Sequence, residues 1–97
     1  MQAYSYEFFA SHVRETFALS LGDSSVDMTL MEARRRPPRV VAGIRAEPFT
    51  LYFKCASPIV LPQKLYPFKN PGTGTVEIFI VPVAREPDGV IYEAVFN

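Results

Sequence analysis

The chain has 97 residues, of which 48% are hydrophobic and 21% are charged, so it is not an intrinsically disordered segment and it is long enough to bury one core. Ten basic and ten acidic residues cancel in net charge, which argues against a basic nucleic-acid-binding domain and permits self-association. One cysteine and one histidine exclude an intramolecular disulfide and a four-ligand zinc site built from these residue types alone.

The start of the chain lacks the basic and apolar regions of a signal peptide. No apolar run approaches the roughly 20 residues that a membrane-spanning helix needs. We therefore expect a single cytoplasmic domain over residues 1–97 that does not associate with membranes.

The first predicted element is a helix over residues 5–14. Ser5 is a plausible N-cap and Glu7 suits the positive end of the helix dipole. The apolar residues recur at helical spacing, at Tyr6, Phe9, Ala10 and Val13.

From Thr16 the apolar period changes to two, which is typical of a half-buried strand. The turn residues Gly22-Asp23-Ser24-Ser25 separate two such runs, so residues 15–33 are predicted to form a β-hairpin. The prolines and arginines of residues 34–48 interrupt the pattern, and we expect a long loop there.

Later segments again alternate. Phe49, Leu51, Phe53 and Cys55 predict a third strand with Cys55 facing inward. The next segment contains Pro58, Pro62 and Pro67, which restrict it to an edge strand or an irregular extended chain, with residues 65–68 as its paired part. After a turn at residues 70–74, residues 76–83 are apolar on both parities, as in a central strand covered on both faces. Glu86-Pro87-Asp88-Gly89 predicts a hairpin turn before a last strand over residues 90–96.

These elements predict a mainly β fold at the margin of the α+β class. We expect one antiparallel six-stranded meander that forms a small barrel or a two-layer sandwich. The short helix would plug one end or cover one face.

Arginines dominate the charge of the predicted loop and are able to bind phosphates or an acidic partner through forked contacts. The alternative is a solvated loop whose charges prevent pairing with another sheet. Nucleic-acid binding is not expected, because the domain as a whole is not basic. The cluster consists of Arg34, Arg35, Arg36, Arg39 and Arg45.

His12 lies near Glu7 and Glu15, which is the spacing of an oriented base, but a surface histidine flanked by acids is the simpler interpretation. A dyad with Cys55 would need a polar pocket that the sequence does not indicate. We therefore predict no catalytic residue, no metal and no cofactor.

The tyrosines give more aromatic surface than a core of this size encloses, which favours an interface, although ordinary half-buried strand positions would also suit them. They are Tyr4, Tyr6, Tyr52, Tyr66 and Tyr92.

Four segments resemble a family of short bacterial proteins of unknown function: Glu47-Pro48-Phe49-Thr50-Leu51-Tyr52-Phe53, Leu61-Pro62-Gln63, Val81-Pro82-Val83 and Asp88-Gly89-Val90-Ile91-Tyr92-Glu93-Ala94-Val95-Phe96-Asn97. The ending Tyr-Glu-Ala-Val-Phe-Asn is the most specific of them. The resemblance implies no known activity; an association of family members with phage-tail-collar-like proteins implies an assembly or accessory role.

The sequence thus predicts a non-enzymatic interaction or assembly module that binds a protein partner or further copies of itself. The alternatives are a small-ligand-binding β-barrel and an enzyme that uses His12 and Cys55. The predicted partner-binding residues are Arg35, Arg36, Arg39, Arg45, Tyr52, Tyr66 and Tyr92.

Overall fold

The computed structural model describes the backbone of residues 4–97 and their side chains, except those at positions 41, 44, 45 and 46. Its elements, in chain order, are α1 (Tyr6–Ala10), β1 (Thr16–Ser20), β2 (Ser25–Arg35), β3 (Arg39–Val41), β4 (Ile44–Ala46), β5 (Phe49–Cys55), β6 (Lys64–Asn70), β7 (Gly74–Glu86) and β8 (Gly89–Phe96).

Six of these strands form one antiparallel sheet that closes on itself as a barrel in the order β1-β2-β5-β8-β7-β6. The predicted mainly β, antiparallel fold class is therefore confirmed, and of the two architectures the structure forms the barrel. One connection departs from a simple meander, because β5 pairs with β8 and β6 pairs with β1 and β7. The chain between them crosses one end of the barrel, and this crossing segment comprises residues 56–63.

The helix is shorter than predicted. The Ser5 side chain caps it by accepting a hydrogen bond from the Phe8 N–H at 3.1 Å, but the helix ends at Ala10. Arg14 adopts the left-handed conformation with φ of 78°, and its N–H donates to the Leu30 carbonyl at 2.6 Å. Pairing with β2 thus pulls the chain out of the helix before residue 14.

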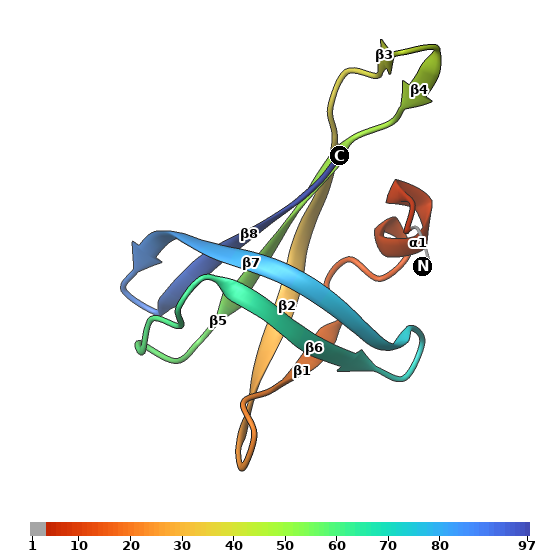
Figure 1. The fold of residues 1–97 in the computed structure, drawn as a ribbon. Coiled ribbons are helices and arrows are strands. Elements are labelled where there is room, and N and C mark those ends of the chain that lie inside the picture. Colours follow the sequence, from red (N-terminus) through yellow and green to blue (C-terminus); the bar gives the residue numbers. More distant parts are fainter. Residues whose placement is uncertain (1–3) are drawn as a thin grey trace.

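The predicted loop at residues 34–48 is largely β structure. Arg34 and Arg35 continue β2 and pair with Thr50 and Phe49 of β5. Their long side chains reach solvent from strand positions, so a run of arginines does not by itself end a ladder. Beyond Pro38, β3 and β4 form a separate hairpin that projects from the barrel (Figure 1).

Two strand predictions are corrected. β6 is not an edge strand, because it pairs with β7 along its length and with β1 at Leu19 and Ala18. β7 is not covered on both faces: its burial alternates, and the Phe79 side chain is 51% exposed. The predicted turn at Glu86-Pro87-Asp88-Gly89 joins β7 to β8 as expected.

Side chains fill the barrel interior. The rings of Phe17, Phe53 and Phe68 contact one another with centroids 4.8 to 6.3 Å apart. Cys55 faces inward and is 2% exposed, as predicted. Within residues 4–97, no helix is long and apolar enough to cross a membrane.

Candidate functional site

A pocket of about 520 Å³ lies at the end of the barrel that carries α1, which we call the α1 end. This is where β2 and β8 finish and β5 begins. The pocket is bounded by the start of the helix, the end of β2 and the last residue of the sequence. Its lining residues are Tyr4, Ser5, Tyr6, Glu7, Arg35, Arg36, Pro38, Glu47, Pro48 and Asn97.

Arg35 joins β2 to the helix across one wall of the pocket. Its guanidinium lies 4.5 Å from the centroid of the Tyr6 ring and donates to Glu7 Oε1 at 2.9 Å. The Arg35 side chain remains 62% exposed, so a bound molecule is able to reach it. A cation stacked on an aromatic ring is a common anchor in protein interfaces.

Arg36, which follows β2, joins this wall of the pocket to the end of β8. Its Nη2 donates to the Phe96 carbonyl at 2.7 Å and to Asn97 Oδ1 at 3.3 Å. Its own backbone N–H donates to the Pro48 carbonyl at 3.0 Å. The Nε atom of Arg36 is buried without a hydrogen-bond partner among the described residues. These contacts make Arg36 a positioning residue of the pocket rather than a free cation.

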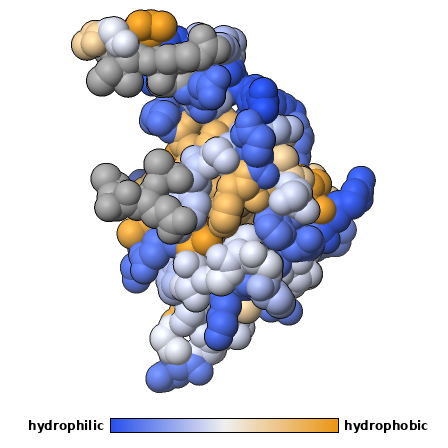
Figure 2. All heavy atoms as spheres, turned by 90° about the vertical axis from the view of Figure 1, so that its right-hand side faces the viewer, coloured by the Kyte–Doolittle hydropathy of each residue, from blue (hydrophilic) through white to orange (hydrophobic). Residues whose placement is uncertain are grey.

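An aromatic cluster lies beneath the pocket. The Phe49 and Phe96 rings stack with centroids 4.6 Å apart, and Phe9 of α1 packs 6.0 and 5.4 Å from them. Phe9 is fully buried, so the helix plugs this end of the barrel through one side chain. On the face that carries α1, apolar side chains gather in a strip bordered by hydrophilic residues (Figure 2).

Of the other arginines in the cluster, Arg34 and Arg39 do not line the pocket. Arg39 belongs to β3 and is exposed. Arg45 belongs to β4, and its side chain is outside the described part of the structure. Arg34 lies on the outer face of the sheet, bonded to Glu32 Oε2 at 2.7 Å, and this hydrogen bond raises the pKa of Arg34.

The three tyrosines that were predicted to bind a partner lie in two different environments. Tyr52 is half-buried on the outer face, where its hydroxyl donates to Glu93 Oε2 at 3.1 Å; burial, followed by this bond, raises its pKa. Tyr66 and Tyr92 are buried in the core, so the prediction that they offer surface to a partner is wrong. Tyr66 shares the parity of Phe68, and Tyr92 that of Val90, which is a signal for the inward face that sequence reasoning missed.

The buried tyrosines instead hold the crossing segment. The Tyr66 hydroxyl donates to the Pro62 carbonyl at 2.8 Å, and the Tyr92 hydroxyl accepts from the Leu61 N–H at 3.0 Å. Burial raises the pKa of Tyr92. Each hydroxyl is satisfied by a backbone group, which is what an inward tyrosine requires.

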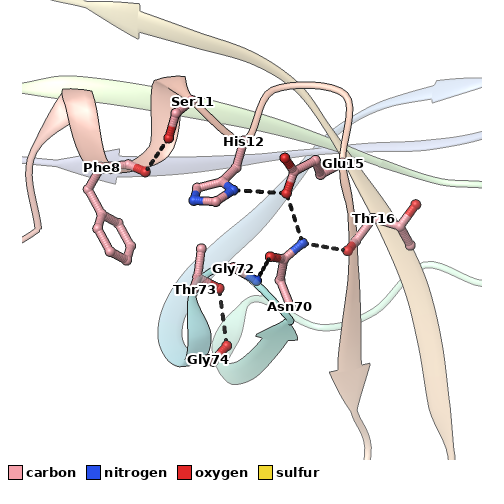
Figure 3. A network of polar contacts seen from close by, with 9 residues as sticks. All are labelled: Phe8, Ser11, His12, Glu15, Thr16, Asn70, Gly72, Thr73 and Gly74. Atoms are coloured by element: carbon pink, nitrogen blue, oxygen red, sulfur yellow. Dashed lines mark hydrogen bonds and ion pairs between the residues drawn. The ribbon is translucent and has the colours of Figure 1, made fainter.

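His12 belongs to a polar network between the helix and the β6–β7 turn (Figure 3). Its Nδ1 lies 2.8 Å from Glu15 Oε1, and Asn70 Nδ2 donates to the same oxygen at 3.3 Å and to the Thr16 carbonyl at 3.0 Å. The Gly72 N–H donates to Asn70 Oδ1 at 2.7 Å. The hydrogen bond with His12 lowers the pKa of Glu15. These hydrogen bonds join the chain after α1 to the start of β1 and to the β6–β7 turn. We call the network of His12, Glu15, Asn70 and Gly72 the latch.

Cys55 is not part of that network. It lies at the opposite end of β5, paired with Met28 and Val90, and is buried there. The arrangement does not bring His12 and Cys55 together. Among residues 4–97, no group of three or more acidic, histidine or cysteine residues is placed to hold a metal ion.

Sequence reasoning had identified Arg35 and Arg36 but not the rest of the pocket. The sequence indicates Tyr6 only as an apolar helix residue and as one of five tyrosines that favour an interface, and Glu7 only as a residue suited to the helix dipole. Nothing local marks Pro48 or Asn97 as pocket residues. These residues meet only because α1, β2, β5 and β8 converge at one end of the barrel.

Comparisons with known proteins give a family without an assigned activity. No curated protein and no solved structure matches the chain. The family model that does match spans residues 4–96, nearly all of the sequence. The chain therefore belongs to the family described as a domain of unknown function, DUF6916.

Proposed function

We propose that this domain is a non-enzymatic interaction or assembly module that binds another protein, or a further copy of itself, through the pocket at the α1 end. The observation that carries the proposal is the exposed Arg35, stacked on Tyr6 and bonded to Glu7 at the rim of a concave surface of about 520 Å³.

The chemistry of the pocket supports a protein partner. Arginine and tyrosine are enriched at interface anchors, and this pocket is lined by two residues of each type, Arg35, Arg36, Tyr4 and Tyr6. The adjoining β3–β4 hairpin extends this surface away from the barrel (Figure 1). It carries Val40, which is 65% exposed, beside Arg39.

The partner belongs, in this proposal, to a bacterial assembly such as a phage-tail-like particle, and the interaction takes place in the cytoplasm. Zero net charge permits homo-oligomers, because no long-range repulsion opposes them. Binding to nucleic acid is not part of the proposal, since the pocket combines two arginines with two glutamates.

A small ligand is the second candidate, because the pocket volume falls within the roughly 300–1,000 Å³ of small-molecule sites. The ligand would occupy this pocket and not the barrel interior, which side chains fill.

The test is site-specific photocrosslinking in the native host from position 38, which is exposed at the pocket rim. The crosslinking residue is introduced into three chains: the wild type, Arg35→Ala and Arg85→Ala. Arg85 is an exposed β7 arginine at the opposite end of the barrel, so Arg85→Ala is the control. We expect one defined protein adduct, or a dimer of this chain, that Arg35→Ala weakens several-fold and Arg85→Ala retains. Equal yields from all three chains would contradict the proposal.

A further inference from the structure

We infer that the first half of β7 is an open sheet edge that takes an extended strand from a partner protein, with a basic residue placed opposite Glu77. This inference concerns a surface distinct from the pocket and does not depend on the function proposed above.

The edge arises because β7 and β8 separate. They pair only from Val81 to Glu86 of β7, while β8 continues with β5 as far as Phe96. Residues Gly74–Ile80 of β7 therefore pair with β6 alone. The two strands diverge towards the side of the barrel on which α1 lies (Figure 1), and α1 packs chiefly against β2.

Among the described residues, the backbone groups at this edge have no hydrogen-bond partner on the side away from β6. In an antiparallel ladder, every second residue turns its N–H and C=O towards one neighbour and the next residue turns them to the other side. Pro67 has no N–H to donate and is paired with Glu77, so we assign Glu77 to the residues that turn away from β6. By the same alternation, Thr75 and Phe79 also present their backbone groups to the open edge.

The exposed side chains of the edge specify the occupant. Thr75, Glu77 and Phe79 point outward, while Val76, Ile78 and Ile80 are buried. Glu77 forms no ion pair or side-chain hydrogen bond with any other described residue. An added strand with Lys or Arg opposite Glu77 and apolar residues at the alternate, inward positions would match this edge, because opposite charges stabilise cross-strand pairs.

A second copy of the chain fits the same edge poorly. Antiparallel pairing of two Gly74–Ile80 segments over their full length is centred on Glu77, and it places two carboxylates directly opposite each other. Shifting the register by two residues avoids that contact but shortens the paired segment from seven residues to five, because β7 pairs with β8 from Val81 onward. Like charges placed opposite each other destabilise a strand pair, so the partner strand comes from another protein.

The experiment uses two fluorescently labelled heptapeptides of alternating valine and threonine, one with a central lysine and the other with a central glutamate. Binding is measured by anisotropy with the wild type, Glu77→Lys and Asp27→Lys. Asp27 is an exposed β2 acid that serves as the matched charge control. We expect the wild type and Asp27→Lys to prefer the lysine peptide about two- to five-fold, and Glu77→Lys to prefer the glutamate peptide.

Amide hydrogen exchange supplies the backbone readout. In the free protein, the amides of Thr75, Glu77 and Phe79 should exchange faster than those of Val76, Ile78 and Ile80, and the lysine peptide should slow them. Failure of both peptides to bind, a preference indifferent to residue 77, or equal protection of all six amides in the free chain would overturn the inference. Dimerisation of the chain through this edge would also overturn it. Arg35→Ala should leave peptide binding unchanged, which separates this result from the pocket.

Discussion

The two ends of the barrel are closed in different ways. At the α1 end, the closing element is a five-residue helix that inserts Phe9 against Phe49 and Phe96. The polar contacts of His12, Glu15 and Asn70 fasten the chain after that helix to the β6–β7 turn.

The far end, where β5 finishes and β8 begins, is closed by the crossing segment and the β7–β8 turn. Tyrosine hydroxyls hold the backbone of the crossing segment. Lys54 bonds Asp88 at 2.8 Å and Glu86 at 3.0 Å, and the bond to Asp88 is the main reason that the pKa of Lys54 is raised. A cavity at this end, lined by Leu21, Val26, Cys55, Ser57, Ile59 and Leu61, measures about 70 Å³.

Because the two ends are closed differently, they contribute differently to the stability of the fold and to the binding of a partner. At the far end, the residues that close the barrel form hydrogen bonds and ion pairs with one another, and the cavity there is small. At the α1 end, a single aromatic plug closes the core while the pocket and the open β7 edge stay accessible. We therefore expect substitutions at the far end to act on folding, whereas exposed positions at the α1 end act on binding.

The largest expected effect concerns Phe9, the side chain that plugs the α1 end of the barrel. Phe9→Ala should lower the free energy of unfolding by about 3 kcal/mol, because it removes a fully buried ring and leaves a cavity. Urea denaturation measures the change. Phe79→Ala, which removes a half-exposed ring from β7, should cost about 1 kcal/mol or less and is the control. Equal losses would mean that α1 does not close the core.

At the far end, Gly89→Ala should lower the free energy of unfolding by about 2 kcal/mol, because the added methyl group has no room. Gly89 has φ of 152°, and a Cβ at this position would overlap the Cys55 carbonyl oxygen. Thermal unfolding followed by circular dichroism measures it. Pro87→Ala alters the same turn without adding an atom near Cys55 and should cost under about 1 kcal/mol. A neutral Gly89→Ala would show that β5 and the turn are less tightly packed than described.

A double-mutant cycle probes the latch at the α1 end. A Cβ at position 72 would lie 2.6 Å from His12 Cε1, so Gly72→Ala should displace the imidazole and break its bond with Glu15. On a His12→Ala background the same substitution should be nearly neutral, giving a coupling energy of about 1 kcal/mol by urea denaturation. Additive losses would mean that the helix and the turn are not joined through His12.

The smallest effect is the pH dependence of the latch. The pKa of Glu15 is lowered from its ordinary value of 4.5, chiefly by the hydrogen bond with His12, so ionised Glu15 stabilises the fold above that value. This contribution is lost as the pH falls through the lowered pKa. The difference in melting temperature between the wild type and Glu15→Gln should therefore shrink between neutral pH and about pH 3. A constant difference across this range would contradict the assignment.

Local patterns predicted the parts of the fold that depend on near neighbours. The β1–β2 hairpin, the turn before Gly89 and the inward Cys55 follow from alternation and turn chemistry, which act over a few residues. The same rule predicted wrongly where a long side chain reaches solvent from a strand, as at Arg34 and Arg35. For Tyr66 and Tyr92, alternation indicates the inward face, but the prediction placed them at an interface, since a tyrosine suits either side of a sheet until a partner for its hydroxyl is known.

Local features of the chain specify a mainly β antiparallel domain with a helix at its start and an arginine segment before β5, because period and proline placement are local properties. The closure of the sheet as a barrel, the separation of β7 from β8 and the contact of Arg35 with Tyr6 become visible only in the folded protein. Those outcomes depend on pairings between strands distant in the chain and on the packing of Phe9 against Phe49 and Phe96, and no local pattern encodes which distant partner a strand or ring will find.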